Sequence, residues 1–286
     1  MGTKRALLAV GRCTGAWHLP AAWYGSRRLT VLAYHRIVDH DSPGFVGYAG
    51  NASATPSEFA AQIAWVAERF TPIELVDLVA AVAGGPLPER PVLVTFDDGY
   101  RDNLTAALPV LERHRVPATV FLATDHIDSD TPFWWDRAAW CFTAAPAQQA
   151  RLPLLGEVGL SGDRRGVTRK WVQHAKRLPD AALRAAVDAL PAALGVSIPE
   201  GTFRGVTLTW DDVAAMTARG VAFGAHTCSH PILTRVDPAT AAAEITGSAR
   251  RVAEATGVRP AGFAYPNGQR ADVNTAVESA VADTGI

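Results

Sequence analysis

Short apolar runs alternate with amphipathic stretches along most of the chain, a pattern typical of strands that alternate with helices. Buried strands are predicted at 29–34, 91–96, 118–122, 221–225 and 261–265. The chain from the second of these runs to the third reads strand, acidic turn, helix, strand. This order is a βαβ unit, which implies parallel strands joined by a right-handed crossover. We therefore expect an α/β fold.

Helix starts are marked by capping residues. Thr55-Pro56-Ser57-Glu58 combines a capping threonine, a proline suited to the first helical position and a glutamate that completes a capping box. Thr209 and Asp237-Pro238 predict two further starts, the second opening a helix to about residue 256. Helices are also expected at about 103–114 and 272–282, and a helix or a short strand plus helix at 73–83.

The stretch at about 137–205 interrupts the alternation. It is rich in alanine, amphipathic and broken by proline and glycine, so we expect a helical insertion there. Residues 1–28 are interpreted as an N-terminal extension and residues 29–286 as the main domain. Another strand is expected to begin where the chain stops, so the domain is expected to lack its last strands.

Composition describes an ordinary globular protein, with 48% hydrophobic residues, a net charge of −1 and basic residues in isolated pairs. This disfavours nucleic acid as a partner. No apolar run has the length of an integral membrane segment, and the run after Lys4-Arg5 is too short for a convincing signal peptide. We expect a cytoplasmic location, with the periplasm or the extracellular space as alternatives. Three cysteines without repeated spacing argue against a disulfide framework.

Two adjacent carboxylates, Asp97 and Asp98, follow the apolar strand at 91–96 and precede Gly99. Because side chains alternate along an extended chain, the two should point in different directions. One could then bind a metal ion while the other stays free as a base. The structural alternative is a simple Asp-Asp-Gly turn between a strand and a helix.

Histidines also lie at strand ends. His226 and His230, four residues apart, follow the strand at 221–225, and His35 follows the first strand. In parallel α/β folds functional residues gather at the carboxyl ends of strands. One Asp and two His suit Zn²⁺ or a similar ion, and three protein ligands are typical of a catalytic site. Hydrogen-bonded structural histidines are the alternative, and Cys228 is expected to be a small buried residue facing away.

The segment Phe133-Trp134-Trp135-Asp136 is unusually aromatic. Aromatic residues at this density most often belong to a core. Flat rings also stack on the apolar faces of sugars, so a glycan-binding surface is the second interpretation.

The segments Thr95–Gly99 and His226–His230 together resemble the first two motifs of the polysaccharide deacetylases. These are the NodB homology domains, or carbohydrate esterase family 4, and the resemblance runs from about residue 29 to the end. It implies a deformed (β/α) barrel of about seven strands and a metal-dependent hydrolase that removes N-acetyl groups from a polysaccharide. By position, Asp97 would be the general base, and Asp98, His226 and His230 would bind one divalent ion, Zn²⁺ first, with Co²⁺ or Ni²⁺ possible.

The segment Phe263–Gly268 occupies the place of the third family motif, which forms one wall of the groove. Ala264 stands where the family often has an arginine that pairs with the catalytic aspartate, so this contact is missing or supplied elsewhere. The late motif with a catalytic histidine is not found before Ile286. The residues expected to contact substrate are Tyr265, Pro266, Asn267, Trp134 and Trp135.

One branch of the family fits better than the rest. Tyr34-His35-Arg36, the aromatic segment 133–136 and the Phe-Ala-Tyr-Pro form of the third motif are similar to deacetylases of poly-β-1,6-N-acetylglucosamine and related exopolysaccharides. That resemblance implies an N-acetylated glycan as substrate and His35 as the general acid. Two other functions stay open: an O-acetyl esterase acting on an acetylated polysaccharide, and a glycan-binding protein without turnover. The sequence leaves the oligomeric state open.

Overall fold

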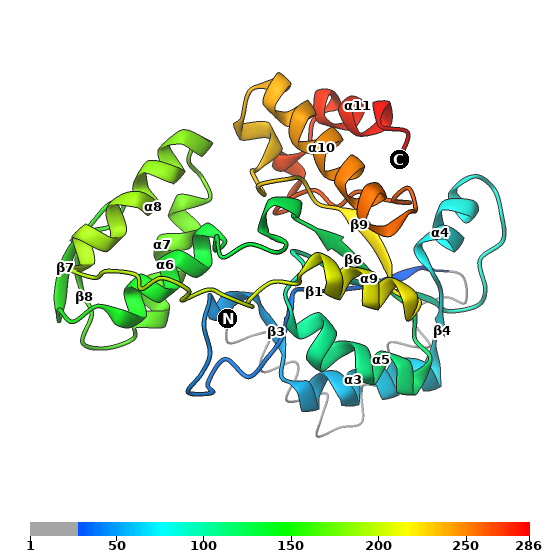
Figure 1. The fold of residues 1–286 in the computed structure, drawn as a ribbon, viewed down its shortest axis with the longest axis horizontal. Helices are drawn as coiled ribbons and strands as arrows, with labels where there is room; N and C mark the ends of the chain where they lie inside the picture. The colour runs from blue at the N-terminus through cyan, green and yellow to red at the C-terminus, as the bar shows by residue number, and fades with distance from the viewer. Residues whose placement is uncertain (1–27) are drawn as a thin grey trace.

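The computed structural model describes residues 28–286, so the predictions about the N-terminal extension, its apolar run and Cys13 lie outside the described part. A five-stranded parallel sheet forms the centre (Figure 1). Its path is β1-β5-β6-β9, and β4 pairs with the start of β5. The strands are β1 (Thr30–Tyr34), β4 (Thr71–Pro72), β5 (Pro91–Phe96), β6 (Ala118–Leu122) and β9 (Ala222–Ala225).

Four of the five predicted strands are confirmed to within one residue. The fifth, at 261–265, is wrong: the segment makes only a single parallel bridge between Ala225 and Phe263. Pro260 and Pro266 flank it, and neither can donate a backbone hydrogen bond to a ladder. The segment still lies against β9, because the Ala264 N–H donates to the Ala225 carbonyl oxygen at 2.9 Å.

The predicted helix starts are confirmed, since Thr55 and Thr209 form capping boxes and Asp237 caps its helix. The helices around the sheet are α3 (Pro56–Arg69), α4 (Leu75–Val82), α5 (Leu108–His114), α9 (Trp210–Ala218), α10 (Pro238–Thr256) and α11 (Thr275–Asp283). A π-helical turn, η3 (Asn103–Ala107), leads into α5. The short elements are η2 (Ala49–Asn51), η4 (Thr124–His126), η5 (Leu233–Arg235), η6 (Arg270–Asp272), β2 (Arg36–Ile37) and β3 (Ala52–Ala54).

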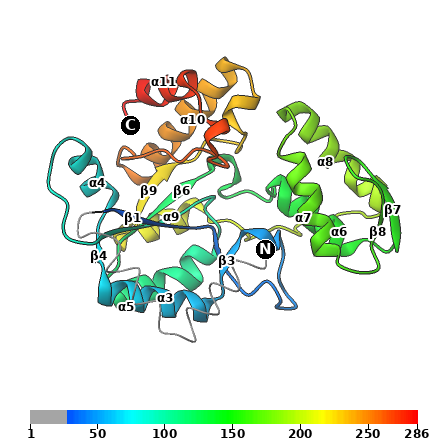
Figure 2. The same cartoon turned by 180° about the vertical axis from the view of Figure 1, so that it is seen from behind.

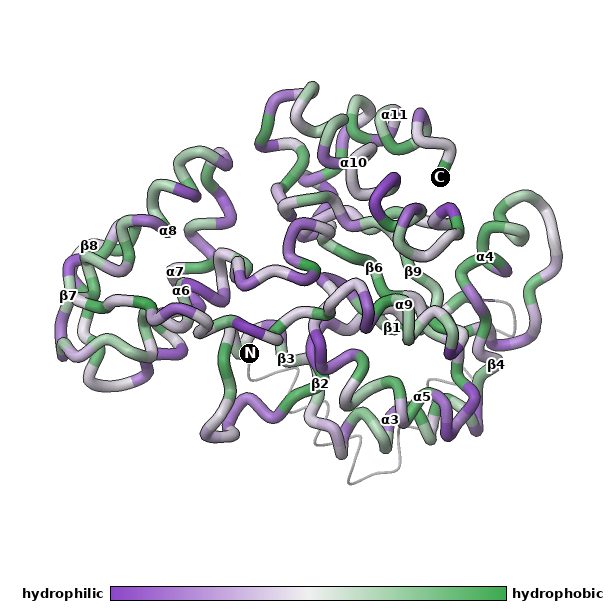
Figure 3. The backbone as a smooth tube through the Cα atoms, viewed as in Figure 1, coloured by the Kyte–Doolittle hydropathy of each residue, from purple (hydrophilic) through white to green (hydrophobic). Residues whose placement is uncertain are grey.

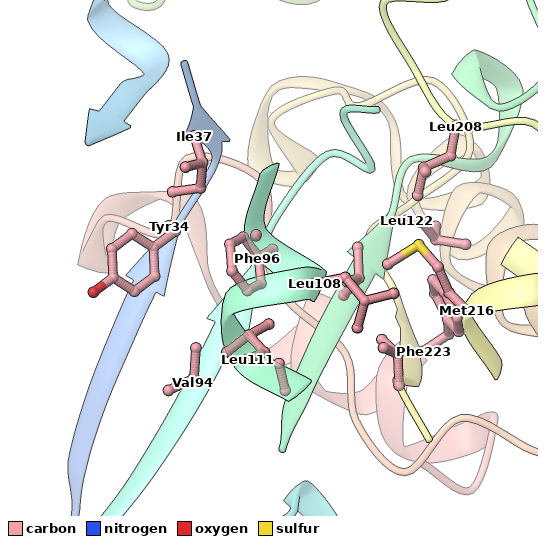
Figure 4. Packing of buried hydrophobic residues seen from close by; sticks show 14 of the residues in the cluster. Tyr34, Ile37, Val94, Phe96, Leu108, Leu111, Leu122, Leu208, Met216 and Phe223 are labelled. Carbon is pink, nitrogen blue, oxygen red and sulfur yellow. The ribbon is translucent and has the colours of Figure 1, made fainter. Parts of the chain in front are cut away.

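Helices pack on both sides of the sheet, with α3 and α5 on one side and α10 and α11 on the other (Figures 1 and 2). Alternate side chains of the central strands enter different apolar clusters, as a pleated strand requires. Val94, Phe96 and Leu122 pack with α3, α5 and α9 (Figure 4). Leu93 and Phe121 face the other way, towards α4. The hydrophobic colour accordingly follows β6 and β9 in Figure 3.

The insertion forms a lobe beside the sheet (Figure 1). Its elements are α6 (Trp134–Ala144), β7 (Gln149–Leu152), β8 (Gly156–Gly159), α7 (Arg164–Ala175) and α8 (Asp180–Leu194). The antiparallel β7–β8 hairpin was not expected, because its strands are short and mostly exposed. The lobe has an apolar cluster of its own around Trp171 and Phe142. Among residues 28–286, no helix combines the length and apolar character needed to cross a membrane.

Candidate metal centre and its pocket

Asp97 and Asp98 end β5 in a turn that separates their side chains. Asp98 and Gly99 have left-handed φ values of +75° and +82°. The Asp98 side chain is consequently buried, while Asp97 is half-buried. A Cβ at Gly99 would lie 2.7 Å from the Leu122 side chain, so only glycine fits this close approach. The two side chains thus differ in burial, and that they point in different directions stays a prediction.

Asp98, His226 and His230 converge on one point. Asp98 Oδ1 lies 3.6 Å from His226 Nε2 and 3.4 Å from His230 Nε2. One ligand atom from each residue lies within 4.8 Å of the others, a spacing that one metal ion can bridge. The three residues follow β5 and β9, which are joined through β6, so the parallel sheet delivers them to one edge.

Hydrogen bonding shows that this set suits a cation. His226 Nδ1 lies 2.7 Å from the carbonyl oxygen of Ala264, which can only accept, so Nδ1 carries the proton and Nε2 a lone pair. That lone pair faces Asp98, and neither carboxylate oxygen of Asp98 has a hydrogen-bond partner among residues 28–286. Buried acceptors that face one another are unfavourable unless a cation lies between them. The donor set therefore fits a divalent ion.

The pKa shifts agree with this interpretation. Burial, reinforced by the charge of Asp97, raises the pKa of Asp98 well above its ordinary value. Burial and the neighbouring His226 lower the pKa of His230 well below its ordinary value. Without a cation both groups are thus driven to their neutral forms. A bound divalent ion favours the carboxylate and the neutral imidazole that act as ligands.

The segment from His226 to His230 is a tight loop rather than a helical turn. Thr227 and His230 have left-handed φ values of +66° and +61°, and the His230 N–H donates to Thr227 Oγ1 at 3.1 Å. Cys228 is half-buried, not fully buried as expected, because it lies at the margin of α10 with its Sγ 3.5 Å from the Glu244 carbonyl oxygen. It takes no part in the ligand set.

Glu244 of α10 supports this loop and was missed by sequence reasoning. Its Oε2 accepts the backbone N–H groups of Cys228 and Ser229 at 2.8 Å each, and its Oε1 accepts the Ser229 hydroxyl at 2.6 Å. At Gly247, one turn further along α10, a Cβ would lie 2.7 Å from Cys228 Sγ. Helix α10 thus packs closely against the loop and hydrogen-bonds to its backbone.

The metal set lies in a cavity of about 140 Å³, called here the metal pocket. The predicted residues that line it are His35, Asp97, Asp98, Trp135, His226, His230, Tyr265 and Asn267, with Gly268 from the segment predicted to form one wall. The unforeseen ones are Tyr48, Asn51 and Lys176. Pro266 is buried beside this group without lining the cavity. Trp134 lines a different cavity.

His35 is fixed through its backbone. Its N–H donates to Ser53 Oγ at 2.9 Å, and its carbonyl oxygen accepts from Asn103 Nδ2 at 2.8 Å. Burial lowers the pKa of the imidazole, and the negative charge of Asp97 opposes that shift. The imidazole thus shares the metal pocket with Asp97.

Lys176 brings a positive charge from the lobe into the metal pocket. It directly follows α7, and its Nζ donates to Asn267 Oδ1 at 3.0 Å. Asn267 in turn donates from Nδ2 to Asp272 at 2.6 Å. Burial lowers the pKa of Lys176, while Asp98 and Asp272 oppose the shift. No motif marked this lysine in the sequence, because it follows a helix and is distant along the chain from every strand of the sheet.

Trp135 belongs both to the core and to the pocket wall. It is almost fully buried, and its Nε1 donates to the Tyr100 hydroxyl at 2.8 Å. Its ring stacks on Phe133 with centroids 4.7 Å apart and meets His230 edge-on at 4.7 Å. The aromatic segment therefore restricts the orientation of the His230 ring.

Comparisons with known proteins agree with this geometry. A family model described as polysaccharide deacetylase matches residues 84–286. A poly-β-1,6-N-acetyl-D-glucosamine N-deacetylase of Staphylococcus epidermidis is 32% identical over 114 residues, which are 37% of this chain and 39% of that protein. The Escherichia coli K12 protein of the same name is 38% identical over 68 residues, 23% of this chain and 10% of that protein. The match thus spans under two fifths of either relative.

Solved structures share the fold. The Streptococcus pyogenes deacetylase PplD in complex with acetate superimposes with a TM-score of 0.57 at 18% identity, covering 91% of this chain and 81% of that one. IcaB from Ammonifex degensii gives a TM-score of 0.51 at 17% identity, with 91% and 81% covered. The α/β fold with a parallel sheet is thus that of deacetylases, and it is consistent with the expected deformed barrel.

Proposed function

Because this chain belongs to the polysaccharide deacetylase family, we propose that it is a metal-dependent hydrolase that removes N-acetyl groups from N-acetylglucosamine units of a polysaccharide. One observation carries the proposal. The buried set of Asp98, His226 and His230, with both Asp98 oxygens unpaired among the described residues, opens into the same pocket as Asp97 and His35. That arrangement offers a cation site, a base and an acid around one small cavity.

Asp98, His226 and His230 would hold the ion, for which Zn²⁺ is the best match and Co²⁺ or Ni²⁺ would also suit. When bound, the ion polarises the acetamide carbonyl and makes water a better nucleophile. Trp135 and the carbonyl of Ala264 keep the two imidazoles oriented for this task.

Asp97 and His35 would move the protons. Asp97, held through its backbone N–H on the Tyr34 carbonyl oxygen at 2.9 Å, takes a proton from the attacking water. His35 gives a proton to the departing sugar nitrogen, which is too basic to leave as an anion near neutral pH. Each such contribution is typically worth about 10² to 10⁴ in rate. The products are acetate and a glucosamine unit.

Lys176 would supply the positive charge that the family places elsewhere. Ala264 cannot act as the arginine it replaces, and it contributes only its backbone carbonyl. Lys176 lines the same pocket as Asp97 and lowers the pKa of His35. We therefore assign to it an electrostatic part in setting the pKa of the acid, His35.

The substrate is proposed to be a β-1,6-linked polymer of N-acetylglucosamine, the glycan named for the curated relatives. Tyr265 and Asn267 line the pocket beside the reacting groups and would contact the sugar, with Pro266 supporting them. Trp135 would contribute its edge to the same wall, and Trp134 would lie further along the glycan.

The deciding experiment measures acetate release from β-1,6- and β-1,4-linked N-acetylglucosamine oligomers with added Zn²⁺. Wild type and the Asp97→Asn variant are compared, with metal content determined for both. Release that needs the ion and disappears in Asp97→Asn supports the proposal. Release only from an O-acetylated glycan would replace it by the esterase function, and tight glycan binding with no release by a binding function.

A further inference from the structure

A second cavity, of about 640 Å³, lies between the lobe and the loops after β6 and β9. It is called here the lobe cavity. Ligand pockets usually measure roughly 300 to 1,000 Å³, so this one has the size of a binding site, whereas the metal pocket of about 140 Å³ admits only part of a sugar. The reacting acetamide group fits the small cavity, and the rest of a glycan needs another place.

The two cavities share one lining residue. His230 lines both, and Ser229 beside it lines the lobe cavity. The adjacent tryptophans divide in the same way, since Trp135 lines the metal pocket and Trp134 lines the lobe cavity. A chain of linked sugars that places one residue at the metal set can therefore continue into the lobe cavity.

The lining combines an aromatic ring with fixed polar groups. Trp134 is half-buried, which leaves part of its indole for stacking. Arg137 is paired with Asp188 at 2.5 Å, and Arg184 with Asp180 at 2.6 Å. The guanidinium and carboxylate groups of these two ion pairs can hydrogen-bond to sugar hydroxyls.

Carboxylates outnumber cationic groups in the lining of the lobe cavity. Five carboxylates and two guanidinium groups line the lobe cavity, whereas two carboxylates and the ammonium group of Lys176 line the metal pocket. Asp125 and Glu200 are exposed carboxylates of the lobe cavity for which no ion pair is found among the described residues. A protonated glucosamine amine is therefore attracted by the lobe cavity.

We propose that the lobe cavity is a second glycan-binding site, which takes glucosamine residues that carry a free amine and adjoin the N-acetylglucosamine residue in the metal pocket. This inference rests on the proposed deacetylase function. The enzyme then acts preferentially on units next to ones already deacetylated. Anionic glycans are disfavoured by the same carboxylates.

Binding is measured apart from turnover by titrating Zn²⁺-loaded Asp97→Asn protein with two β-1,6-linked pentamers, one fully acetylated and one partly deacetylated. The partly deacetylated pentamer is expected to bind several-fold more tightly at low salt. Adding Asp125→Asn and Glu200→Gln, both at exposed positions that should not disturb folding, removes that advantage. Adding Trp134→Ala or Trp134→Phe weakens both pentamers, about tenfold for the alanine. Trp65→Ala on α3, outside the lining of both cavities, is the control and changes neither.

Equal affinity for the two pentamers would overturn the amine preference, and unchanged affinity in both Trp134 variants would overturn the site. These outcomes are separable from failure of the proposed function. Absence of acetate release from every oligomer by the wild-type protein would refute the deacetylase. If the Trp134 variants release acetate and their rate depends on oligomer length as in wild type, only the proposal for the lobe cavity is refuted.

Discussion

Glu244 binds Ser229 twice, accepting its backbone N–H at 2.8 Å and its hydroxyl at 2.6 Å. The same carboxylate also accepts the N–H of Cys228, so one side chain of α10 fixes the middle of the ligand loop. His226 and His230, the proposed ligands, lie at either end of that loop, and their spacing therefore depends on a residue of another element.

Replacing Glu244 by glutamine is expected to weaken metal binding. The glutamine amide keeps one oxygen acceptor, but its NH₂ group cannot accept from the loop. Part of the hydrogen bonding to Cys228 and Ser229 is therefore lost, and the loop becomes less well fixed. Loss of support around a metal site typically costs about 10- to 100-fold in affinity. Competition with a chromophoric chelator measures the Kd for Zn²⁺. Glu254→Gln, an exposed change on the same helix, is the control, and an unchanged Kd in Glu244→Gln would contradict the prediction.

Asp98→Asn should separate stability from metal binding. The apo protein is expected to unfold at the same temperature as wild type or higher, because a buried carboxylate with no hydrogen-bond partner among the described residues is removed. Zn²⁺ should no longer raise its Tm. In wild type a ligand at 1,000 times its Kd adds about 4 kcal/mol. Thermal scans with and without the ion test this, and a large loss of apo stability would argue against it.

The dependence of kcat/KM on pH should reflect the lowered pKa of His35. Burial lowers that pKa below 6.5, and the proposed acid is active only when protonated. Activity is therefore expected to fall as pH rises through the lowered pKa, which places the upper limb of kcat/KM below pH 6.5. His35→Ala should remove this limb along with about 10² to 10⁴ of the rate. An upper limb that persists in His35→Ala would assign it to another group.

Lys176→Met is expected to move the same limb to higher pH. Lys176 lowers the pKa of His35 through its positive charge, and methionine keeps most of the side-chain volume without the charge. The pH dependence of kcat/KM is compared with that of Lys170→Met, an exposed lysine on α7. Identical profiles for the two variants would show that Lys176 exerts no electrostatic effect on the acid.

Cys228 should react slowly with alkylating reagents. Burial raises the pKa of its thiol to about 11, so the thiolate fraction at pH 8 is on the order of 10⁻³. Iodoacetamide labelling, read by peptide mass mapping, is expected to be about 100-fold slower than for an ordinary thiol and to rise about tenfold per pH unit. Rapid labelling at pH 8 would mean that the loop opens.

Four of the residues found from the sequence share one property, which is that they come at the end of a strand. Asp97, Asp98, His226 and His35 could be named because a short apolar run fixes where the strand ends, and parallel strands deliver their ends to one edge. The strands and capped helices were predictable for the same local reasons. The family motifs added the order and spacing that distinguish ligands from structural histidines.

Two of the residues missed are positioned by helices. Lys176 and Glu244 reach the pocket and the ligand loop through tertiary packing of α7 and α10, which leaves no periodic trace in the sequence. The failed strand at 261–265 has a similar cause, because its apolar pattern is that of a strand while the prolines at its ends prevent a ladder. The β7–β8 hairpin lacked a pattern, since its strands are mostly exposed.

The lobe has its own apolar cluster and enters the chain between β6 and α9, while the proposed ligands, base and acid follow strands of the sheet. Most substitutions inside the lobe therefore leave the reacting groups in place, apart from changes at Lys176 and at the residues that line the two cavities. Substitutions within this one contiguous segment can therefore change which glycans are bound without altering the proposed ligands, base and acid.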